Sequence, residues 1–208
     1  MPDFDSLIVE FDKALRTVFG DPAGERPSPG LAVPDTELSS EEKSGAAALM
    51  RVNHCGELCA QALYQGQALV ARTESTREVL LQAAQEERDH LAWCRQRLDD
   101  LGGSKSLLNP LWYAGSFSLG VASGLLGDKW SMAFLVETER QVERHLDDHL
   151  TRLPESDVKS RKILEAMRDD EIRHGNSGEL HGAAPMPQTM KLAMRIMSRL
   201  MTRTAYWV

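Results

Sequence analysis

The chain has 208 residues, a length that suits one domain with short arms. Its formal net charge of −7 argues against a dedicated nucleic-acid-binding protein. Hydrophobic residues (42%) and charged residues (26%) have globular frequencies, which exclude wholesale disorder. Three cysteines, an odd number without framework spacing, indicate a reducing compartment, and the acidic start MPDFDSL predicts no secretory signal.

Glycine and proline are concentrated in a few places, and the stretches between them have the apolar spacing of helices. The first arm, residues 3–19, predicts a helix, and residues 20–38 form a linker rich in proline and glycine. Ser39 and Glu42 match a capping box that starts the next helix. The apolar face of the arm consists of Phe4, Leu7, Ile8, Phe11, Leu15 and Phe19.

Long helical segments make up most of the remaining chain. The polar turn at 73–76 separates the first two, and Pro154 separates the last two. Because β-branched alternation is almost absent, we expect an all-α fold, a four-helix bundle, and the ligand pattern described below makes this bundle ferritin-like. The four segments are expected at about 40–73, 75–101, 128–153 and 155–182.

Two further segments differ from a plain soluble bundle. Residues 106–127 carry no charge, but Pro110 and four glycines break up their helix, so we expect a connection that packs on the bundle or dips into one membrane leaflet. Residues 186–208 carry basic side chains four apart and no acid, which is typical of an amphipathic helix at an anionic membrane. A terminal helix docked on its own bundle is the alternative. The expected membrane-facing residues are Leu107, Leu108, Trp112, Phe117, Lys191, Arg195, Arg199 and Arg203.

These segments predict the organisation of the chain. An amphipathic arm and linker occupy residues 1–38, and the bundle with its uncharged connection occupies residues 39–185. The basic amphipathic helix at residues 186–208 completes it.

Two Glu-x-x-His motifs carry the chemistry, Glu87 to His90 and Glu171 to His174. On a helix, residues three apart share a face, so one carboxylate and one imidazole can reach the same ion. Glu57 lies 30 residues before Glu87, with the 73–76 turn near their midpoint. Each of these two is then about 22 Å from the turn at 1.5 Å per residue, level with the other across a hairpin.

The second half of the chain repeats this arrangement. Glu139 lies 32 residues before Glu171, with Pro154 near their midpoint. Two hairpins packed face to face then bring four carboxylates and two imidazoles into one layer, where an uncompensated charge would be costly. We therefore expect iron or manganese, two ions, held by Glu57, Glu87, His90, Glu139, Glu171 and His174.

Other polar residues near the motifs are expected to play lesser parts. His54, His145 and Asp170 are candidates for hydrogen bonds to the ligands from outside, as is Asp89, although a solvated acid is at least as good an interpretation of the two aspartates. His149 and His181 are expected at the surface. The three cysteines, Cys55, Cys59 and Cys94, are expected to be small core residues.

Taken together, these motifs resemble the demethoxyubiquinone hydroxylases, in particular their bacterial branch. The sequence RVNHCGE at 51–57 resembles the RVxHxGE opening of that family. Glu87 to His90, the NPLW connection at 109–112, the GLLG at 124–127 and Asp170 to His174 follow in the expected order. The resemblance covers residues 45–208 and leaves the first 40 outside.

The resemblance implies a di-iron monooxygenase that uses O2 to hydroxylate a prenylated quinol late in ubiquinone synthesis. It implies that the six residues are iron ligands, with Glu87 and Glu171 bridging. A peripheral site on the cytoplasmic face of the cell membrane is expected, with a biosynthetic complex or a homo-oligomer as further partners. Leu146 follows His145 where some members carry a tyrosine, so we keep His145 out of the metal set.

Three alternatives remain open. An iron-storage or ferroxidase bundle would use the same ligands in a soluble shell of many chains. Another di-iron oxidase would act on a different lipid. A membrane-peripheral helical module would hold no metal and would carry these carboxylates as surface charges.

Overall fold

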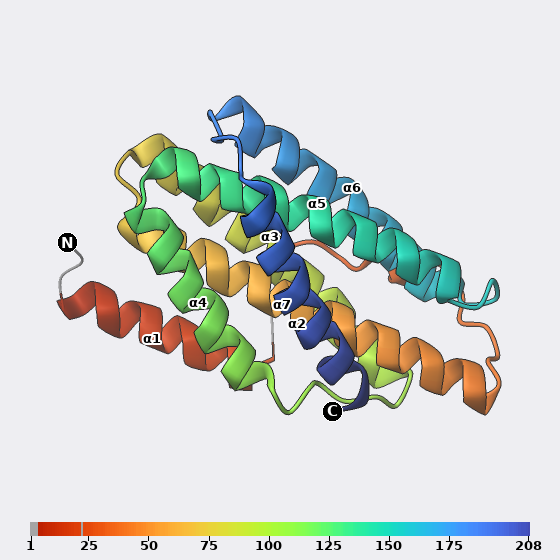
Figure 1. Ribbon diagram of the computed structural model, residues 1–208. Helices are drawn as coiled ribbons and strands as arrows, with labels where there is room; N and C mark the ends of the chain where they lie inside the picture. Colours follow the sequence, from red (N-terminus) through yellow and green to blue (C-terminus); the bar gives the residue numbers. More distant parts are fainter. Residues whose placement is uncertain (1–3, 22) are drawn as a thin grey trace.

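The structure, a computed structural model, describes residues 4–21 and 23–208, with the side chains of Ser6 and Leu7 excepted. The expected places of Asp3, the Leu7 side chain and Pro22 therefore lie outside it. Over the described residues the fold is all-α, with a 3-10 turn, η1, and no strand. The helices (Figure 1) are α1 (Phe4–Phe19), α2 (Ser40–Val70), α3 (Glu74–Asp100), α4 (Asn109–Leu125), α5 (Asp128–Arg152), α6 (Val158–Leu180) and α7 (Gln188–Trp207), and η1 is Pro29–Ala32.

Two hairpins, α2 with α3 and α5 with α6, form the expected four-helix bundle (Figure 1). The capping box is confirmed, because the Ser39 hydroxyl accepts from the Glu42 N–H and the Glu42 carboxylate accepts from the Ser39 N–H. Thr73 caps α3 in the polar turn. Asp157 caps α6, which therefore begins three residues later than the sequence predicts.

The apolar core is divided into two main clusters. One surrounds Met50 and Leu164, and the other surrounds Tyr64 and Leu135. Both clusters draw on α2, α3 and α5, and along each of these three helices the predicted ligands lie between the two clusters. The polar layer thus lies in the middle of the bundle, with an apolar cluster on each side of it along the bundle axis.

The uncharged connection is a continuous helix, α4, and the expectation that proline and glycine break it is wrong. Pro110 occupies the first turn, where its missing N–H is not needed. The glycines allow close contact with α2: a Cβ on Gly120 would lie 2.2 Å from the Leu63 carbonyl oxygen, and one on Gly66 would lie 2.4 Å from the Phe117 carbonyl oxygen. The glycines, which lower helix propensity, thus allow the backbones of α2 and α4 to pack in direct contact.

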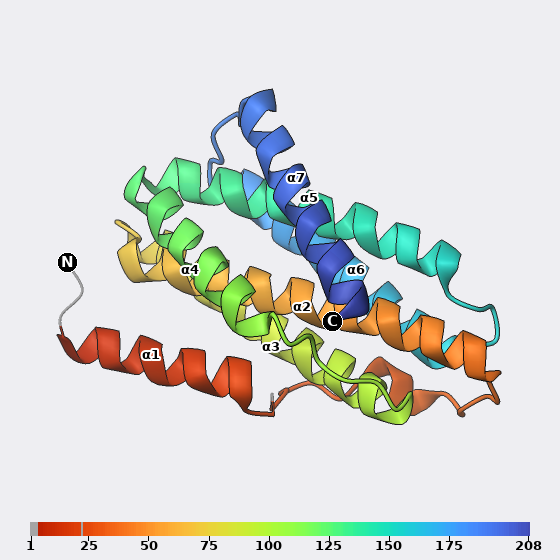
Figure 2. The same ribbon diagram turned by 60° about the horizontal axis from the view of Figure 1, so that its bottom comes forward.

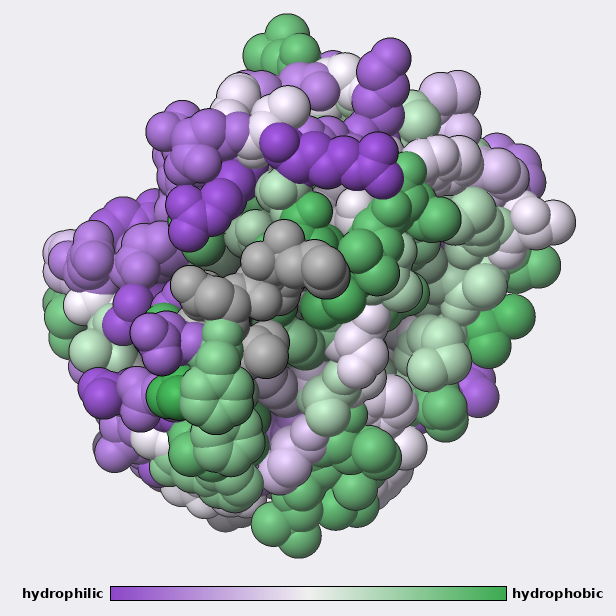
Figure 3. All heavy atoms as spheres, turned by 90° about the vertical axis from the view of Figure 1, so that its left-hand side faces the viewer, coloured by the Kyte–Doolittle hydropathy of each residue, from purple (hydrophilic) through white to green (hydrophobic). Residues whose placement is uncertain are grey.

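The outer helices α1, α4 and α7 leave apolar side chains in solvent. α4 and α7 both pack on α2, and α1 contacts α2 and α4 (Figures 1 and 2). α1 buries Val18 but exposes the apolar face expected from the sequence. Figure 3 shows the face on the left-hand side of Figure 1. Hydrophobic residues gather in its lower and right-hand parts, and hydrophilic residues gather at its upper left. The exposed residues include Phe4, Ile8, Phe11, Leu15 and Phe19 of α1, Leu111, Leu119 and Leu125 of α4, and Leu192, Ile196 and Leu200 of α7.

No helix within residues 4–21 and 23–208 combines the length and the apolar character that crossing a membrane requires.

The glycine contact between α2 and α4 gives a test of the fold. Gly120→Ala should destabilise the protein by about 1–3 kcal/mol, because the new methyl group overlaps the backbone of α2. Gly115→Ala is the matched control on the same helix, since a Cβ there has no neighbour within 4 Å among the described atoms. It should be neutral or stabilising by up to about 1 kcal/mol, because alanine favours helix over glycine. Urea unfolding measures both, and equal effects would contradict the close contact.

Candidate metal centre

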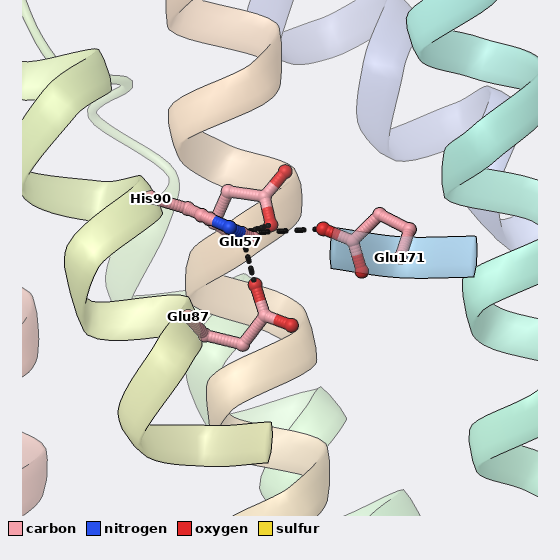
Figure 4. A group of neighbouring side chains, drawn as sticks. All are labelled: Glu57, Glu87, His90 and Glu171. Carbon is pink, nitrogen blue, oxygen red and sulfur yellow. Dashed lines mark hydrogen bonds and ion pairs between the residues drawn. The ribbon is translucent and has the colours of Figure 1, made fainter. Parts of the chain in front are cut away.

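The six carboxylate and histidine side chains predicted from the repeat do converge in the middle of the bundle. Each hairpin contributes two glutamates and one histidine, and all six side chains are buried. They form two groups whose ligand atoms lie within 4.8 Å of one another. The first group is Glu57, Glu87, His90 and Glu171 (Figure 4), and the second is Glu87, Glu139, Glu171 and His174.

Glu87 and Glu171 belong to both groups, and each turns one oxygen toward each histidine. His90 Nδ1 lies 3.1 Å from Glu87 Oε2 and 3.2 Å from Glu171 Oε1. His174 Nδ1 lies 3.6 Å from Glu87 Oε1 and 3.4 Å from Glu171 Oε2. Glu57 approaches only His90, at 3.5 Å, and Glu139 only His174, at 3.3 Å. Two of the four carboxylates are thus common to both groups, and each of the other two faces one histidine.

The electrostatics of the layer show that its carboxylates are poorly compensated by the protein alone. Burial, and then the charge of Glu171, raise the pKa of Glu139 to about 8. Burial and the neighbouring carboxylates also raise the pKa of Glu87 well above its usual value. Burial alone would lower the pKa of His90, but its hydrogen bond to Asp170 and the nearby carboxylates of the layer raise it. The protein holds several acids together where they cannot all be charged.

The donor set fits divalent metal ions. Buried polar atoms without a hydrogen bond are rare in proteins, yet seven ligand-type atoms of this layer have no hydrogen-bond partner among the described residues. Metal ions would satisfy them, and two divalent cations balance four carboxylates. The atoms are Glu57 Oε2, Glu87 Oε1, both carboxylate oxygens of Glu139 and of Glu171, and His174 Nδ1.

A ring of acids and arginines surrounds the layer and holds the outer nitrogen of each histidine. His90 Nε2 donates to Asp170 Oδ2 at 2.9 Å, as expected for Asp170. His174 Nε2 donates to Glu86 Oε2 at 3.1 Å. Arg173 donates to both acids. Each histidine therefore turns Nε2 toward an acid outside the layer and Nδ1 toward the carboxylates within it.

Sequence analysis missed Glu86, although a signal was present. Glu86 directly precedes Glu87 just as Asp170 directly precedes Glu171, so the two motifs match over one more position than we used. Asp89, weighed with Asp170, instead bonds Arg26 of the linker at 2.6 Å. No local pattern around Arg26 marks it.

The remaining histidines lie apart from the ligands. His54 is buried, and burial lowers its pKa to about 3, so it packs as a neutral ring. The hydrogen bond expected from His145 to a ligand is not found among the described residues, and its ring lies 3.8 Å from that of His149. The expectation that His149 is at the surface is wrong, because it is buried against α2 and bonds Asn53 at 2.8 Å. His181 is exposed as expected.

The cysteines are free thiols, and Cys55 and Cys94 are buried while Cys59 is partly buried. Cys55 packs beside Val52 and Ala205, and Cys94 lies in the cluster around Met50. They are small core residues, as expected.

A four-helix bundle with a buried layer of four glutamates and two Glu-x-x-His histidines defines the ferritin-like class of metal-site proteins. Residues 44–205 match the family described as ubiquinone biosynthesis protein COQ7. The chain belongs to this family.

Relatives along the whole chain support this assignment. A protein of Nitrosomonas europaea named 3-demethoxyubiquinol 3-hydroxylase is 57% identical over 208 residues, which is all of both chains. A protein of Dechloromonas aromatica with the same name is 56% identical over 202 residues, or 97% of this chain and 98% of the relative. One of Xanthomonas axonopodis pv. citri, also with that name, is 56% identical over 97% of this chain and 93% of its own.

Removing one carboxylate tests whether the layer binds metal. Mn²⁺ should raise the unfolding midpoint of the unaltered protein, since an ion that binds only the folded state at 100 times its Kd adds about 2.7 kcal/mol. Glu139→Gln should lose the share of this gain that the second group contributes, about half if both groups bind equally, because only that group loses a charge and an anionic donor. Glu143→Gln, one turn further along α5 and outside both groups, should keep it. A full Mn²⁺ effect in Glu139→Gln would contradict the site.

Proposed function

We propose that this protein is a 3-demethoxyubiquinol 3-hydroxylase that inserts one oxygen atom from O2 into the ring of a prenylated quinol. The observation that carries the proposal is the buried layer of six ligand-type side chains in a chain of this family. The names of relatives at 55–57% identity support the reaction. The second oxygen atom leaves as water, with two electrons from an external reductant and two protons.

We further propose that the layer holds two iron ions. His90 and His174 would each bind one, and Glu57 and Glu139 would be terminal ligands, with Glu87 and Glu171 shared. Iron bound there would supply the redox chemistry with O2 that amino-acid side chains lack. Burial of the layer between two apolar clusters supports this role, because it keeps bulk water from the reaction.

The chain's own residues would control the surroundings of the centre. With ions bound, Asp170 and Glu86 would accept the Nε2 protons of the two histidines and leave the Nδ1 lone pairs for the metal. Tyr64 is buried in the apolar cluster beside the layer, and burial, followed by the charge of Glu139, raises the pKa of its hydroxyl. It therefore stays protonated at neutral pH.

We also propose that α4 and α7 face a membrane surface, where the isoprenoid tail of the substrate resides. Arg195, Arg199 and Arg203 are exposed, and beside them runs the exposed apolar row of α7. Of the expected residues, Leu107 is 80% exposed, but Trp112 and Phe117 pack partly against the bundle. Lys191 pairs with Glu137 at 3.1 Å. Exposed leucines such as Leu111 replace the two aromatic residues in the proposed surface.

The reaction is tested with iron-loaded protein, ¹⁸O2, a reductant and a demethoxylated quinol with a short isoprenoid tail. Mass spectrometry should find one ¹⁸O atom added to the ring, and Glu171→Gln should give no product, because both ion positions lose a shared ligand. Protein that binds two ions per chain and adds no oxygen would contradict the hydroxylase proposal. Iron uptake into a shell of many chains, seen by gel filtration, would favour the iron-storage alternative.

Membrane attachment is tested by reversing three charges of α7 together, Arg195→Glu, Arg199→Glu and Arg203→Glu. Each basic residue near an anionic surface contributes about 1 kcal/mol, so the triple variant should bind anionic vesicles more than about 100-fold more weakly. Lys191 is left unchanged because its partner Glu137 is buried.

The matched control reverses three exposed basic residues on other helices, Arg77→Glu, Arg88→Glu and Lys162→Glu, with the same change in net charge. Cosedimentation with vesicles that contain phosphatidylserine measures both triples. If both lose binding equally, or neither does, α7 is not the attachment surface.

A further inference from the structure

The linker before α2 lies directly on the helices that carry the two histidines. The backbone N–H groups of Glu25 and Arg26 donate to Asp89 Oδ1 at 2.6 and 3.2 Å. The Trp93 indole N–H donates to the Arg26 carbonyl at 3.1 Å. A Cβ on Gly24 would lie 3.1 Å from the Ala92 side chain, so the linker backbone touches α3. We call residues 24–30 the strap.

The strap also reaches α6, the helix of the other motif. The η1 turn, which begins at the end of the strap, contacts α6. A Cβ on Gly30 would lie 3.2 Å from the Ile163 side chain. Beyond the strap, Asp35 pairs with Arg97 of α3 and Lys159 of α6 at 3.3 Å each. The linker is thus fixed to both helices between Gly24 and Asp35, although it lies outside the part of the chain that matches the family model.

Arg26 is the one strap side chain that reaches toward the metal layer. Its Nε donates to Asp89 Oδ2 at 2.6 Å, and its Nη2 donates to Asp170 Oδ2 at 2.7 Å. The same Asp170 oxygen accepts from His90 Nε2 at 2.9 Å. The guanidinium lies 4.8 Å from the centre of the Trp93 ring, which in turn lies 5.3 Å from the His90 ring. An unbroken chain of contacts joins the linker to one histidine.

We propose that Arg26 is a positioning residue for His90, which fixes the Asp170 carboxylate so that the imidazole directs Nδ1 at the metal layer. This inference rests on the proposed metal centre. A neutral imidazole has one N–H, and donating it from Nε2 to Asp170 leaves the Nδ1 lone pair for an ion. An arginine that binds two carboxylates through a rigid fork fixes both in direction as well as in charge.

The effect should be confined to one of the two ion positions. The acid behind His174 is Glu86, which receives hydrogen bonds from Arg173, Gln82 and His174. The strap supplies none of these donors. Loss of Arg26 leaves Asp170 with Arg173 alone, bonded to its other oxygen, Oδ1. The oxygen that holds His90 then has no other donor among the described residues.

The experiment is a Co²⁺ titration of the full chain, followed by visible absorbance and NMR. In Arg26→Ala, one of two binding steps should weaken by about 10–100-fold, the usual cost of losing an outer partner of a metal ligand, while the other step keeps its affinity. In the Co²⁺-loaded protein, one of the two shifted histidine N–H signals should exchange faster with water. General destabilisation would not select one histidine.

Arg95→Ala is the matched control. Arg95 also joins the linker to α3, through Asp21 at 3.7 Å, but touches neither Asp89 nor Asp170. It should leave both Co²⁺ steps and both N–H signals unchanged. Arg26→Lys keeps the charge without the fork, so it should weaken the same step by less, and it provides the comparison if Arg26→Ala does not fold.

The two proposals fail in different ways. An unaltered protein that binds no Co²⁺ would overturn the metal centre and the positioning role with it. An unaltered protein that binds two ions, with Arg26 variants that match Arg95→Ala in affinity and exchange, would overturn only the role of Arg26. Equal weakening of both steps would also overturn it.

Discussion

The constraint on which this structure depends is the burial of four carboxylates and two imidazoles in one layer of the bundle. Such charges are costly in a protein interior unless cations or protons compensate them. Two observations reflect this cost: the pKa of Glu139 is raised, and several carboxylate oxygens of the layer have no hydrogen bond among the described residues. The buried layer therefore lowers the free energy of unfolding of the metal-free bundle. Such a cost is expected at a binding site, where residues are chosen for function more than for stability.

The protein supports this layer in successive shells. The ligand-type side chains come from four helices, two apolar clusters close the layer along the bundle axis, and acids on α3 and α6 take the outer histidine protons. Arginines then neutralise those acids nearer the surface, where Arg173 is 55% exposed and can be solvated. From the layer outward, histidines are followed by acids and the acids by arginines. Each of these groups is therefore hydrogen-bonded to a group of the opposite kind one step nearer the surface.

Much of this could be predicted from sequence because it follows from local periodicity. Helix bounds agree within a few residues, and equal hairpin arms were enough to bring Glu57, Glu87, Glu139 and Glu171 together. The errors concern contacts that periodicity does not encode. The α4 glycines resembled helix breakers because their partner backbone on α2 is about 55 residues away in the chain. His149 resembled a surface residue because its partner, Asn53, lies on another helix. Arg26 could not be found at all, since residues 23–28 around it have no regular structure and therefore no period to follow.

The glycine seam between α2 and α4 has a mechanical consequence. Where side chains interdigitate, two helices can slide by exchanging rotamers, but the backbones at Gly66 and Gly120 meet with no side chain between them. Sliding along this seam would drive Cα atoms into carbonyl groups, so α4 and α2 have to move as one body. α4, whose exposed side chains are largely apolar, therefore shifts only together with α2, the helix that bears Glu57.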